Sequence, residues 1–408
     1  MDGGSPRGRR GDSTRGLVKR FTLRKSAAQA ILAGHPWVLP DGFDGRPPTL
    51  KAGEEVVLLD SLGGFCARAL ADGRRGWGPV VRILTTDERG PPLRKLLFRR
   101  LAAARRLRER VVQPGTTAFR LVHGEGDGLP GLVVDRYAGT LVVRPDSDAW
   151  ARRTDVLVDA LRSEAGPSDA IVLKPKSGDA GTLWGEAPEA VVVVEEGRKY
   201  RVRPGFGQKT GFFVDQRANR TDVQHLIRPG DRCLNLFSFT GGFTVAMAVG
   251  GASRVVSVDL SASILADCRA QFPLNGLDSA PHGFEAVDAF QWLPRLARQP
   301  SPPQFDLVVC DPPALAHKRD DLPAAREAYR RIHEALAPLV APGGLLVTCS
   351  CTSRLGPEDL LEDARAGLRA GGRAVRSELR RSGAGPDHPV PAGFAEGRYL
   401  SVLTLALD

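Results

Sequence analysis

A pair of cysteines at the end of an apolar run is the first feature of this sequence that could carry chemistry. Cys349 and Cys351 are separated by one serine and follow the strand-like residues 345–348, in a chain of 408 residues with six cysteines. A cysteine in such a place can act as a nucleophile, bind a metal or fill the core as a small apolar residue. A C-x-C metal site needs a second cluster of ligands, and no histidine lies nearby in the sequence. We therefore predict no metal, and keep the nucleophile and the core residue as alternatives.

An aspartate followed by two prolines is the second such feature. Asp311 ends the apolar run in "VVCDPPALA", where Pro312 and Pro313 stop a strand and stiffen the loop that follows. In an open parallel sheet, ligands bind at the carboxyl ends of the strands. Neighbouring strands would bring Asp311 and the cysteine pair to the same edge, and we expect Cys310 to point into the core.

A third feature is a strand–loop–helix segment that could hold a cofactor. In "CLNLFSFTGGF", residues 233–237 read as a buried strand, "SFTGG" as a tight loop, and residues 243–249 as the start of a helix. We expect Gly241 and Gly242 to let the backbone approach a ligand closely. The next strand, "RVVSVD", ends at Asp259, about 20 residues on, a spacing that suits an acid bonded to ribose hydroxyls.

The loop departs from the G-x-G-x-x-G pattern, and this difference separates two cofactor classes. A dinucleotide needs several glycines and a helix N-terminus for its pyrophosphate. The bulkier loop here suits S-adenosylmethionine (SAM), which has a ribose and an adenine but no phosphate. Asp288, in "EAVDAF", is then placed to bond the adenine amino group. The alternative for Asp259 and for Asp288 is a cap at the end of a strand.

The elements that must position these residues form an α/β protein of several parts. From residue 196 to 408, strands alternate with helices, which is typical of a doubly wound sheet. Residues 17–88 read as short strands separated by turns, and residues 89–195 as a small α+β segment. Residues 1–16 read as a disordered basic tail without the apolar centre of a signal peptide. No apolar stretch is long enough to cross a bilayer, so we expect a cytoplasmic protein with reduced thiols.

The charge balance favours a polyanionic partner. The net charge is +10, and the surplus is concentrated in the tail and in the helix-like residues 93–112, which carry one acid, Glu109. Such basicity is typical of proteins that bind nucleic acid. The alternative is an arginine-rich composition spread over all surfaces.

Ordered stretches along the chain resemble the large-subunit ribosomal RNA cytosine-C5 methyltransferase I family. They are "HPWVLPDGF", "GEGDGLPGLVVDRYAG", "GQKTGFFVDQRANR", "CLNLFSFTGGF", "VVSVDLS", "DPPALA", "GGLLVTCSCTS", "DHPV" and "EGRYL". The resemblance implies an N-terminal PUA-like RNA-binding domain, a small central domain and a Rossmann-like class I methyltransferase domain. It also implies SAM as cofactor, ribosomal RNA as partner and a homodimer.

The resemblance distinguishes the two cysteines. Counted from Gly343 and Gly344, the nucleophile of the family falls on Cys351, and Cys349 falls where the family has an apolar or small residue. Cytosine C5 is a poor nucleophile, and a thiolate that adds at C6 activates it. Asp311 would bond the base near N3. In this chain Ala314 stands where many relatives carry a further cysteine used in product release, so the base that removes the C5 proton has no candidate.

The same resemblance implies a set of cofactor contacts. The segment before the first Rossmann strand would wrap over SAM, and Lys209 within it would contact RNA phosphate. For Asp215 a helix N-cap is an equal alternative, and for His35 we expect core packing. The predicted cofactor-binding residues are Gln208, Phe213, Asp215, Arg217, Phe237, Ser238, Phe239, Thr240, Gly241, Gly242, Asp259, Leu260, Ser261, Asp288, Ala289 and Phe290.

Three rival functions follow from the same residues. One is a methyltransferase acting on a guanine or adenine nitrogen of RNA, which would need no thiol and usually carries an aromatic residue at the position of Ala314. Another is an RNA-binding ribosome-assembly factor with a vestigial SAM pocket. A nicotinamide oxidoreductase is disfavoured by the loop.

Overall fold

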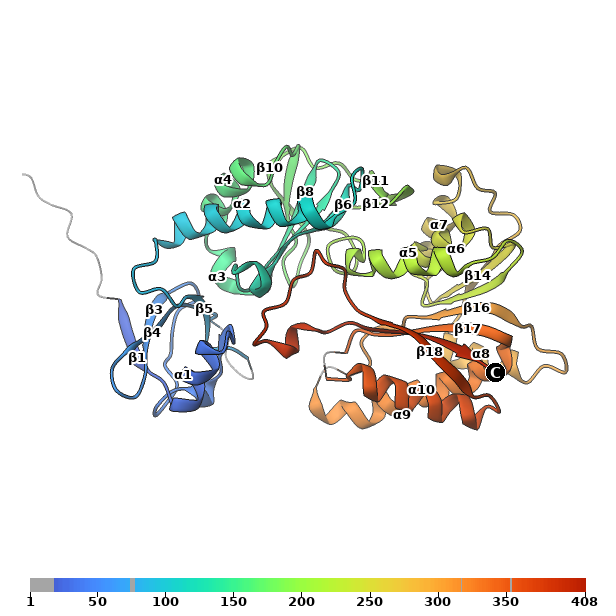
Figure 1. The fold of residues 1–408 in the computed structure, drawn as a ribbon. Coiled ribbons are helices and arrows are strands. Elements are labelled where there is room, and N and C mark those ends of the chain that lie inside the picture. The colour runs from blue at the N-terminus through green and yellow to red at the C-terminus, as the bar shows by residue number, and fades with distance from the viewer. Residues whose placement is uncertain (1–17, 74–77, 317, 353) are drawn as a thin grey trace, which may run out of the picture.

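The computed structural model describes residues 18–73, 78–316, 318–352 and 354–408, which fold into three modules (Figure 1). The predicted basic tail, residues 1–16, lies outside this range. Within it, no helix combines the length and the apolar character needed to cross a membrane. The six cysteines form no disulfide.

The N-terminal module is a five-stranded sheet with one helix packed against it. The strand order is β1-β3-β4-β5-β2, and apolar residues of alternate strand positions form its own core. Its elements are β1 (Lys19–Thr22), α1 (Lys25–Leu32), β2 (Trp37–Val38), β3 (Glu55–Leu59), β4 (Phe65–Ala71) and β5 (Val81–Thr85).

The central module is a second five-stranded sheet, of order β10-β9-β8-β7-β6, covered on one face by two helices. The basic helix predicted over residues 93–112 is α2, Leu93–Val111. Its other elements are β6 (Ala118–His123), β7 (Leu132–Tyr137), β8 (Thr140–Pro145), α3 (Asp148–Ala151), α4 (Thr154–Glu164), β9 (Ala170–Leu173) and β10 (Gly181–Gly185).

A hairpin joins the central module to the third. Strands β11 (Val191–Glu195) and β12 (Arg198–Val202) pair antiparallel, and Val193 and Tyr200 pack between the central sheet and α6 (Gly242–Val249). The predicted boundary between residues 195 and 196 therefore falls inside this hairpin and not between independent units, because hydrogen bonds cross it.

The third module is the predicted doubly wound domain, a seven-stranded sheet of order β15-β14-β13-β16-β17-β19-β18. The first five of these strands are parallel, and β19 runs antiparallel to both of its neighbours. Its strands are β13 (Arg232–Leu236), β14 (Arg254–Asp259), β15 (Gly283–Ala286), β16 (Phe305–Cys310), β17 (Val340–Ser350), β18 (Val375–Ser382) and β19 (Ser401–Leu407). Its remaining helices are α5 (Arg217–Leu226), α7 (Ala262–Ala270), α8 (Ala289–Ala297), α9 (Leu322–Leu336) and α10 (Pro357–Ala370).

Both faces of this sheet are buried, which explains its continuous apolar strands. In β16, Val308 and Cys310 face the core under α8, α9 and α10, whereas Leu307 and Val309 face the core under α5 and α6. The prediction that Cys310 points into the core is confirmed. The acidic and thiol side chains predicted for the site, Asp259, Asp311 and Cys351, lie at or just beyond the strand ends, at the carboxyl edge of the sheet.

A long connection between β18 and β19, residues 383–400, reaches back from the third module to the other two (Figure 1). We call it the C-terminal strap. Its Asp387 is fully buried and accepts hydrogen bonds from the Arg120 backbone N–H at 2.9 Å and the Arg217 side chain at 2.9 Å. Its Phe394 packs against Trp37 of the N-terminal module with ring centroids 4.5 Å apart. The strap therefore contacts all three modules.

Candidate active site between the central and Rossmann-like modules

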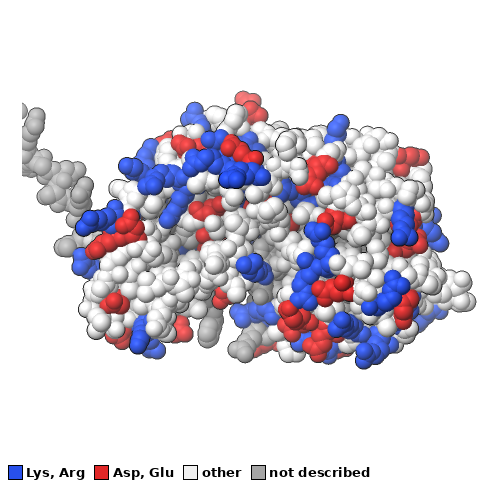
Figure 2. All heavy atoms as spheres, in the orientation of Figure 1, with Lys and Arg blue, Asp and Glu red and all other residues white. Residues whose placement is uncertain are grey.

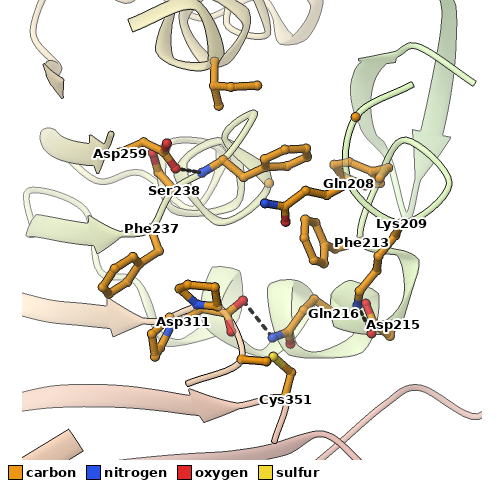
Figure 3. A pocket seen from close by; sticks show the side chains of 18 of the residues that line it. Gln208, Lys209, Phe213, Asp215, Gln216, Phe237, Ser238, Asp259, Asp311 and Cys351 are labelled. Carbon is orange, nitrogen blue, oxygen red and sulfur yellow. Dashed lines mark hydrogen bonds and ion pairs between the residues drawn. The ribbon is translucent and has the colours of Figure 1, made fainter. Parts of the chain in front are cut away.

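A cavity of about 1200 Å³ opens at the carboxyl edge of the seven-stranded sheet (Figure 3). Residues from the ends of β13, β14, β16 and β17 line one side, and the strand ends of the central module line another. Most of the predicted site residues meet here: Gln208, Phe213, Asp215, Phe237, Ser238, Phe239, Gly242, Asp259, Leu260, Ser261, Asp311 and Cys351.

The two cysteines have different surroundings. Cys349, still within β17, is fully buried and packs with Val347 and Val402 in the core under α5 and α6. Cys351, one residue beyond the strand, is only partly buried and lines the cavity. Geometry therefore makes Cys349 a core residue and leaves Cys351 as the thiol that a ligand can reach.

Asp311 lies at the end of β16, next to β17, and is held by a chain of amide groups. The Gln216 Nε2 donates to the Asp311 Oδ2 at 3.0 Å, and Asn219 Nδ2 donates to the Gln216 Oε1 at 2.6 Å. Asn219 also donates to the Gly383 carbonyl at 3.0 Å, at the start of the strap. Gln216 was not among the predicted residues. It lies in a short 3-10 turn, Val214–Gln216, that directs it into the cavity.

The electrostatics of this wall disfavour two neighbouring negative charges. Burial raises the pKa of Asp311 to about 6, and the nearby Asp215 adds to the effect. Burial, followed by the charge of Asp311, raises the pKa of the Cys351 thiol to about 11. At neutral pH Cys351 is therefore a thiol, which must lose its proton before it can attack.

The loop after β13 has a strained backbone. Phe237 and Phe239 both adopt positive φ, of 57° and 47°, which is uncommon for aromatic residues. The Phe239 N–H donates to the Asp259 Oδ2 at 3.0 Å, and the Ser261 N–H donates to the Asp259 Oδ1 at 3.2 Å. Strain of this kind is concentrated at functional sites, where the surrounding structure maintains it.

The two glycines of this loop are required by the packing around them, whatever their part in ligand approach. Gly241 has a φ of 85°, and a Cβ there would lie 2.4 Å from the Cys268 sulfur in α7. A Cβ on Gly242 would lie 3.1 Å from the Arg220 side chain. Gly242 does line the cavity, whereas Gly241 and Thr240 are not among its lining residues.

Asp215 and Arg217 follow one another in the chain but face different partners. Asp215 lines the cavity, where Lys209 and the Tyr399 hydroxyl donate to its Oδ2. Burial alone would raise the pKa of Asp215, but the charge of Lys209 lowers it overall. Arg217 is buried against Asp387 of the strap, at 2.9 Å, so the structure does not bring it to the cavity with the other predicted residues. Asp215 is not a helix N-cap either, because Gln216 occupies that position.

Asp288, Ala289 and Phe290 lie outside the cavity lining. Asp288 is the N-cap of α8 and accepts from the Phe290 N–H at 2.9 Å, the alternative considered for it in the sequence. Phe290 reaches the site only indirectly, through a ring contact with Phe237 at 5.7 Å. The structure thus uses Asp288 as a helix cap, and the adenine contact stays a prediction.

Positive side chains gather over α2 on one face of the molecule (Figure 2). Two of these arginines are structural: Arg108 is buried and pairs with Asp127 at 2.5 Å, and Arg100 donates to the carbonyls of Leu84 and Gly128. Arg94, Lys95 and Arg99 are exposed. The predicted basic surface therefore exists, with fewer free cations than the sequence suggested. Lys209, predicted to contact phosphate, instead pairs with Asp215 and lies 4.4 Å from the Phe213 ring centroid.

Comparison with known proteins agrees with this geometry. Residues 120–379 match the family described as S-adenosylmethionine-dependent methyltransferase, and residues 21–85 match the PUA-like domain family. The chain is 37% identical over 410 residues to a ribosomal RNA large subunit methyltransferase of Deinococcus radiodurans, covering 95% of this chain and 97% of that protein.

The chain belongs to the SAM-dependent ribosomal RNA large-subunit methyltransferase family. A ribosomal RNA large subunit methyltransferase I of Yersinia pseudotuberculosis is 35% identical over 401 residues, covering 94% of this chain and 98% of that protein. Among solved structures, a methyltransferase complexed with SAH superposes with a TM-score of 0.85 at 22% identity, over 95% of this chain and all of that one. At that identity the likeness supports the fold alone. The PUA-like and Rossmann-like predictions are confirmed.

The cavity of this methyltransferase fits the cofactor that defines the family. Ser238 lines the cavity at the end of β13, and its hydroxyl oxygen is buried without a hydrogen-bond partner among the described residues. Asp259, at the end of β14, suits a ribose, and the rings of Phe213 and Phe239 meet edge to face at 5.0 Å beside it. An unpaired buried hydroxyl is costly, and a polar ligand would satisfy it.

Proposed function

We propose that this enzyme forms 5-methylcytosine in large-subunit ribosomal RNA through a covalent bond between Cys351 and cytosine C6. The observation that supports the proposal best is the position of Cys351, which shares one cavity with Asp311, Ser238 and Asp259. A methyltransferase acting on an exocyclic or ring nitrogen has no use for a thiol at this place. The names of the relatives supply the ribosomal substrate class.

Cys351 would act as the nucleophile. Its thiol, with a pKa of about 11, would pass its proton to the Asp311 carboxylate, which lines the same cavity and has a pKa of about 6. The thiolate then adds to C6. The electron pair of the C5–C6 double bond then makes C5 a carbon nucleophile. After methylation, water in the open cavity would take up the C5 proton, the C–H electron pair would restore the double bond, and the Cys351 sulfur would leave as a thiolate.

Asp311 would stabilise the charge that this addition creates. The negative charge that develops on the pyrimidine is spread to N3, and a carboxyl group with a pKa of about 6 can donate a proton or hydrogen bond there near neutral pH. Gln216 fixes one Asp311 oxygen, which leaves the other for the base. Ala314, after the two prolines, provides no aromatic ring on which an adenine or guanine could stack.

The cofactor would lie along the ends of β13 and β14. When bound, SAM supplies an electrophilic methyl group. Ser238 and Asp259 would bond its polar groups, and Phe213, Phe237, Phe239, Leu260, Ser261 and Gln208 would enclose it. The target cytosine would be turned out of any stack to reach Cys351.

The test compares the two cysteines. Cys351→Ala should abolish 5-methylcytosine in a large-subunit RNA fragment, measured by mass spectrometry of nucleosides, while SAM binding by calorimetry stays within twofold of the wild type. Cys349→Ala, the matched control in the core, should keep the product. Normal cytosine methylation by Cys351→Ala would refute the mechanism. A methylated guanine or adenine would indicate the nitrogen-methylating alternative, and absence of transfer to any ribosomal RNA would indicate an assembly factor.

A further inference from the structure

We propose that Arg144, Lys174 and Lys176 of the central module form a phosphate-binding wall of the catalytic cavity, which grips the RNA backbone beside the target nucleotide. The inference rests on the proposed function and names the part of the site that holds the polyanion. All three residues line the same cavity as Cys351. They come from a different module than the nucleophile and were not predicted from the sequence.

The pairing of two strands places the cations together. Strands β8 and β9 are parallel, with Val143 opposite Leu173 at their last paired position. The next residues, Arg144 and Lys174, therefore leave the sheet at the same edge, and the Lys174 N–H still donates to the Val143 carbonyl at 2.8 Å. Like charges at neighbouring positions of a sheet are destabilising unless a ligand of opposite charge compensates them.

The acid in this wall offsets the cations only in part. Arg144 approaches Asp146 at 3.7 Å, beyond hydrogen-bond distance, and both side chains are about two-fifths exposed, at 38% and 41%. The Lys176 ammonium donates to the backbone carbonyl of Asp146, which carries no charge. Three cations minus one carboxylate leave this wall with a net charge of +2. Exposed, partly compensated cations are the side chains that RNA phosphates bind.

The end of the cavity that suits the cofactor has a charge opposite to that of the cationic wall. Its titratable lining residue is Asp259, at the end of β14, which suits a ribose and would repel phosphate. The cavity volume of about 1200 Å³ exceeds the roughly 300–1000 Å³ typical of a pocket for one small molecule. The volume therefore accommodates a nucleotide beside the cofactor, and the cationic wall lies where its phosphates would have to pass.

The experiment removes two charges and measures RNA binding directly. The double variant Lys174→Gln, Lys176→Gln is compared with Lys199→Gln, an exposed lysine of β12 outside the cavity. Fluorescence anisotropy with a large-subunit RNA fragment at several salt concentrations gives Kd and its salt slope, and calorimetry gives the Kd for SAM. We expect the double variant to bind RNA at least tenfold more weakly. Its salt slope should fall by about 1.4, because each lost contact to a single strand removes about 0.7.

The outcomes separate this inference from the proposed function. A wild-type RNA Kd and salt slope in the double variant would overturn the inference, as would a weakened SAM Kd with unchanged RNA binding, because the wall would then hold the cofactor's carboxylate. Arg144→Gln, with the two lysines intact, should lower the slope by about 0.7 and provides a second, independent check. A third outcome combines two measurements: the wild type forms no 5-methylcytosine, and the double variant binds RNA more weakly than the wild type. That outcome would refute the proposed function and support the phosphate-binding wall.

Discussion

Gln216 offers its amide nitrogen to Asp311 because Asn219 occupies its amide oxygen. The two hydrogen bonds, of 3.0 and 2.6 Å, fix which way the Gln216 side chain points, so a donor always faces the carboxylate. The Asn219 oxygen is in turn held by the Ser382 hydroxyl at 2.8 Å, at the end of β18. A chain of hydrogen bonds through Gln216 and Asn219 therefore connects Asp311 to β18, the edge strand of the sheet.

Gln216→Ala should lower kcat for methyl transfer by about 10- to 100-fold. A hydrogen bond to a charged group contributes about 1.5–3 kcal/mol, and about 1.4 kcal/mol corresponds to tenfold in rate. Because this donor lowers the pKa of Asp311, its loss should also move the Asp311 limb of the pH–rate profile to higher pH. The exposed Gln299→Ala is the control. An unmoved pH profile would mean that Gln216 has only a structural part.

Asp311→Asn should stabilise the protein while inactivating it. Burial raises the pKa of Asp311 from its ordinary 3.8 to about 6, so the folded state binds the proton more tightly than the unfolded chain. Stability is lost as pH rises from about 4 to 6, and the loss is complete above pH 6. The rise in the pKa of Asp311 from 3.8 to about 6 corresponds to a loss of at most about 3 kcal/mol in the free energy of unfolding. The loss is smaller where water in the cavity reaches the carboxylate.

Thermal melts between pH 4 and 8 measure this effect. The Tm advantage of Asp311→Asn over wild type should be absent near pH 4, grow toward pH 6 and stay constant above it. Asp41→Asn, at an exposed aspartate of the N-terminal module, is the matched substitution. An advantage of equal size at pH 4 and pH 8 would contradict the linkage.

Gly241→Ala should destabilise the fold by about 2–4 kcal/mol. It combines a left-handed backbone at φ 85° with a Cβ that would lie 2.4 Å from the Cys268 sulfur. Gly178→Ala, at φ 89° with no atom within 4 Å, bears the backbone strain alone and should cost about 1 kcal/mol. Adding Cys268→Ala should recover part of the Gly241→Ala loss in urea unfolding. Equal losses at positions 241 and 178 would argue against the steric contact.

Asp387→Ala should cost about 3–5 kcal/mol, because it leaves the Arg217 guanidinium buried without its carboxylate. Asp267→Ala removes the partner of the half-exposed Arg203 and should cost less than about 1 kcal/mol. The same Asp387 variant should expose residues 383–400 to limited proteolysis, since the central and the third module each lose a hydrogen bond to the strap. Resistance equal to wild type would show that the remaining contacts hold the strap without the Asp387 carboxylate.

The sequence was sufficient to predict the position of a site residue where that position depends only on the strand that the residue follows. Apolar runs ending in Asp259, Asp311 and Cys351 predicted parallel strands with polar ends at one edge, and the structure has them at the ends of β14, β16 and β17. The different environments of Cys349 and Cys351 did not follow from the alternation, because residues two apart in a strand face the same side of the sheet. Only the family resemblance distinguished them, and in the structure β17 ends between them, at Ser350.

Prediction failed where the decisive partner is remote in the sequence. Arg217 is hydrogen-bonded to Asp387, 170 residues away in the sequence, and no local sequence pattern predicts that ion pair. Gln216 lies between two predicted residues, but only the 3-10 turn shows that it, and not Arg217, faces the cavity. For Asp288 the local rule was the better guide, because a helix begins directly after it and takes its carboxylate as a cap.

The C-terminal strap leaves the three modules little freedom to hinge. Phe394 against Trp37, Asp387 against Arg120 and Asn219 against Gly383 fix the N-terminal sheet, the central sheet and the catalytic edge in one arrangement. These contacts fix the position of the exposed cations of α2 relative to the Cys351 sulfur within one chain arrangement. If the arrangement persists on binding, the consequence falls on the substrate: the RNA strand must bend to bring its target base to the cavity.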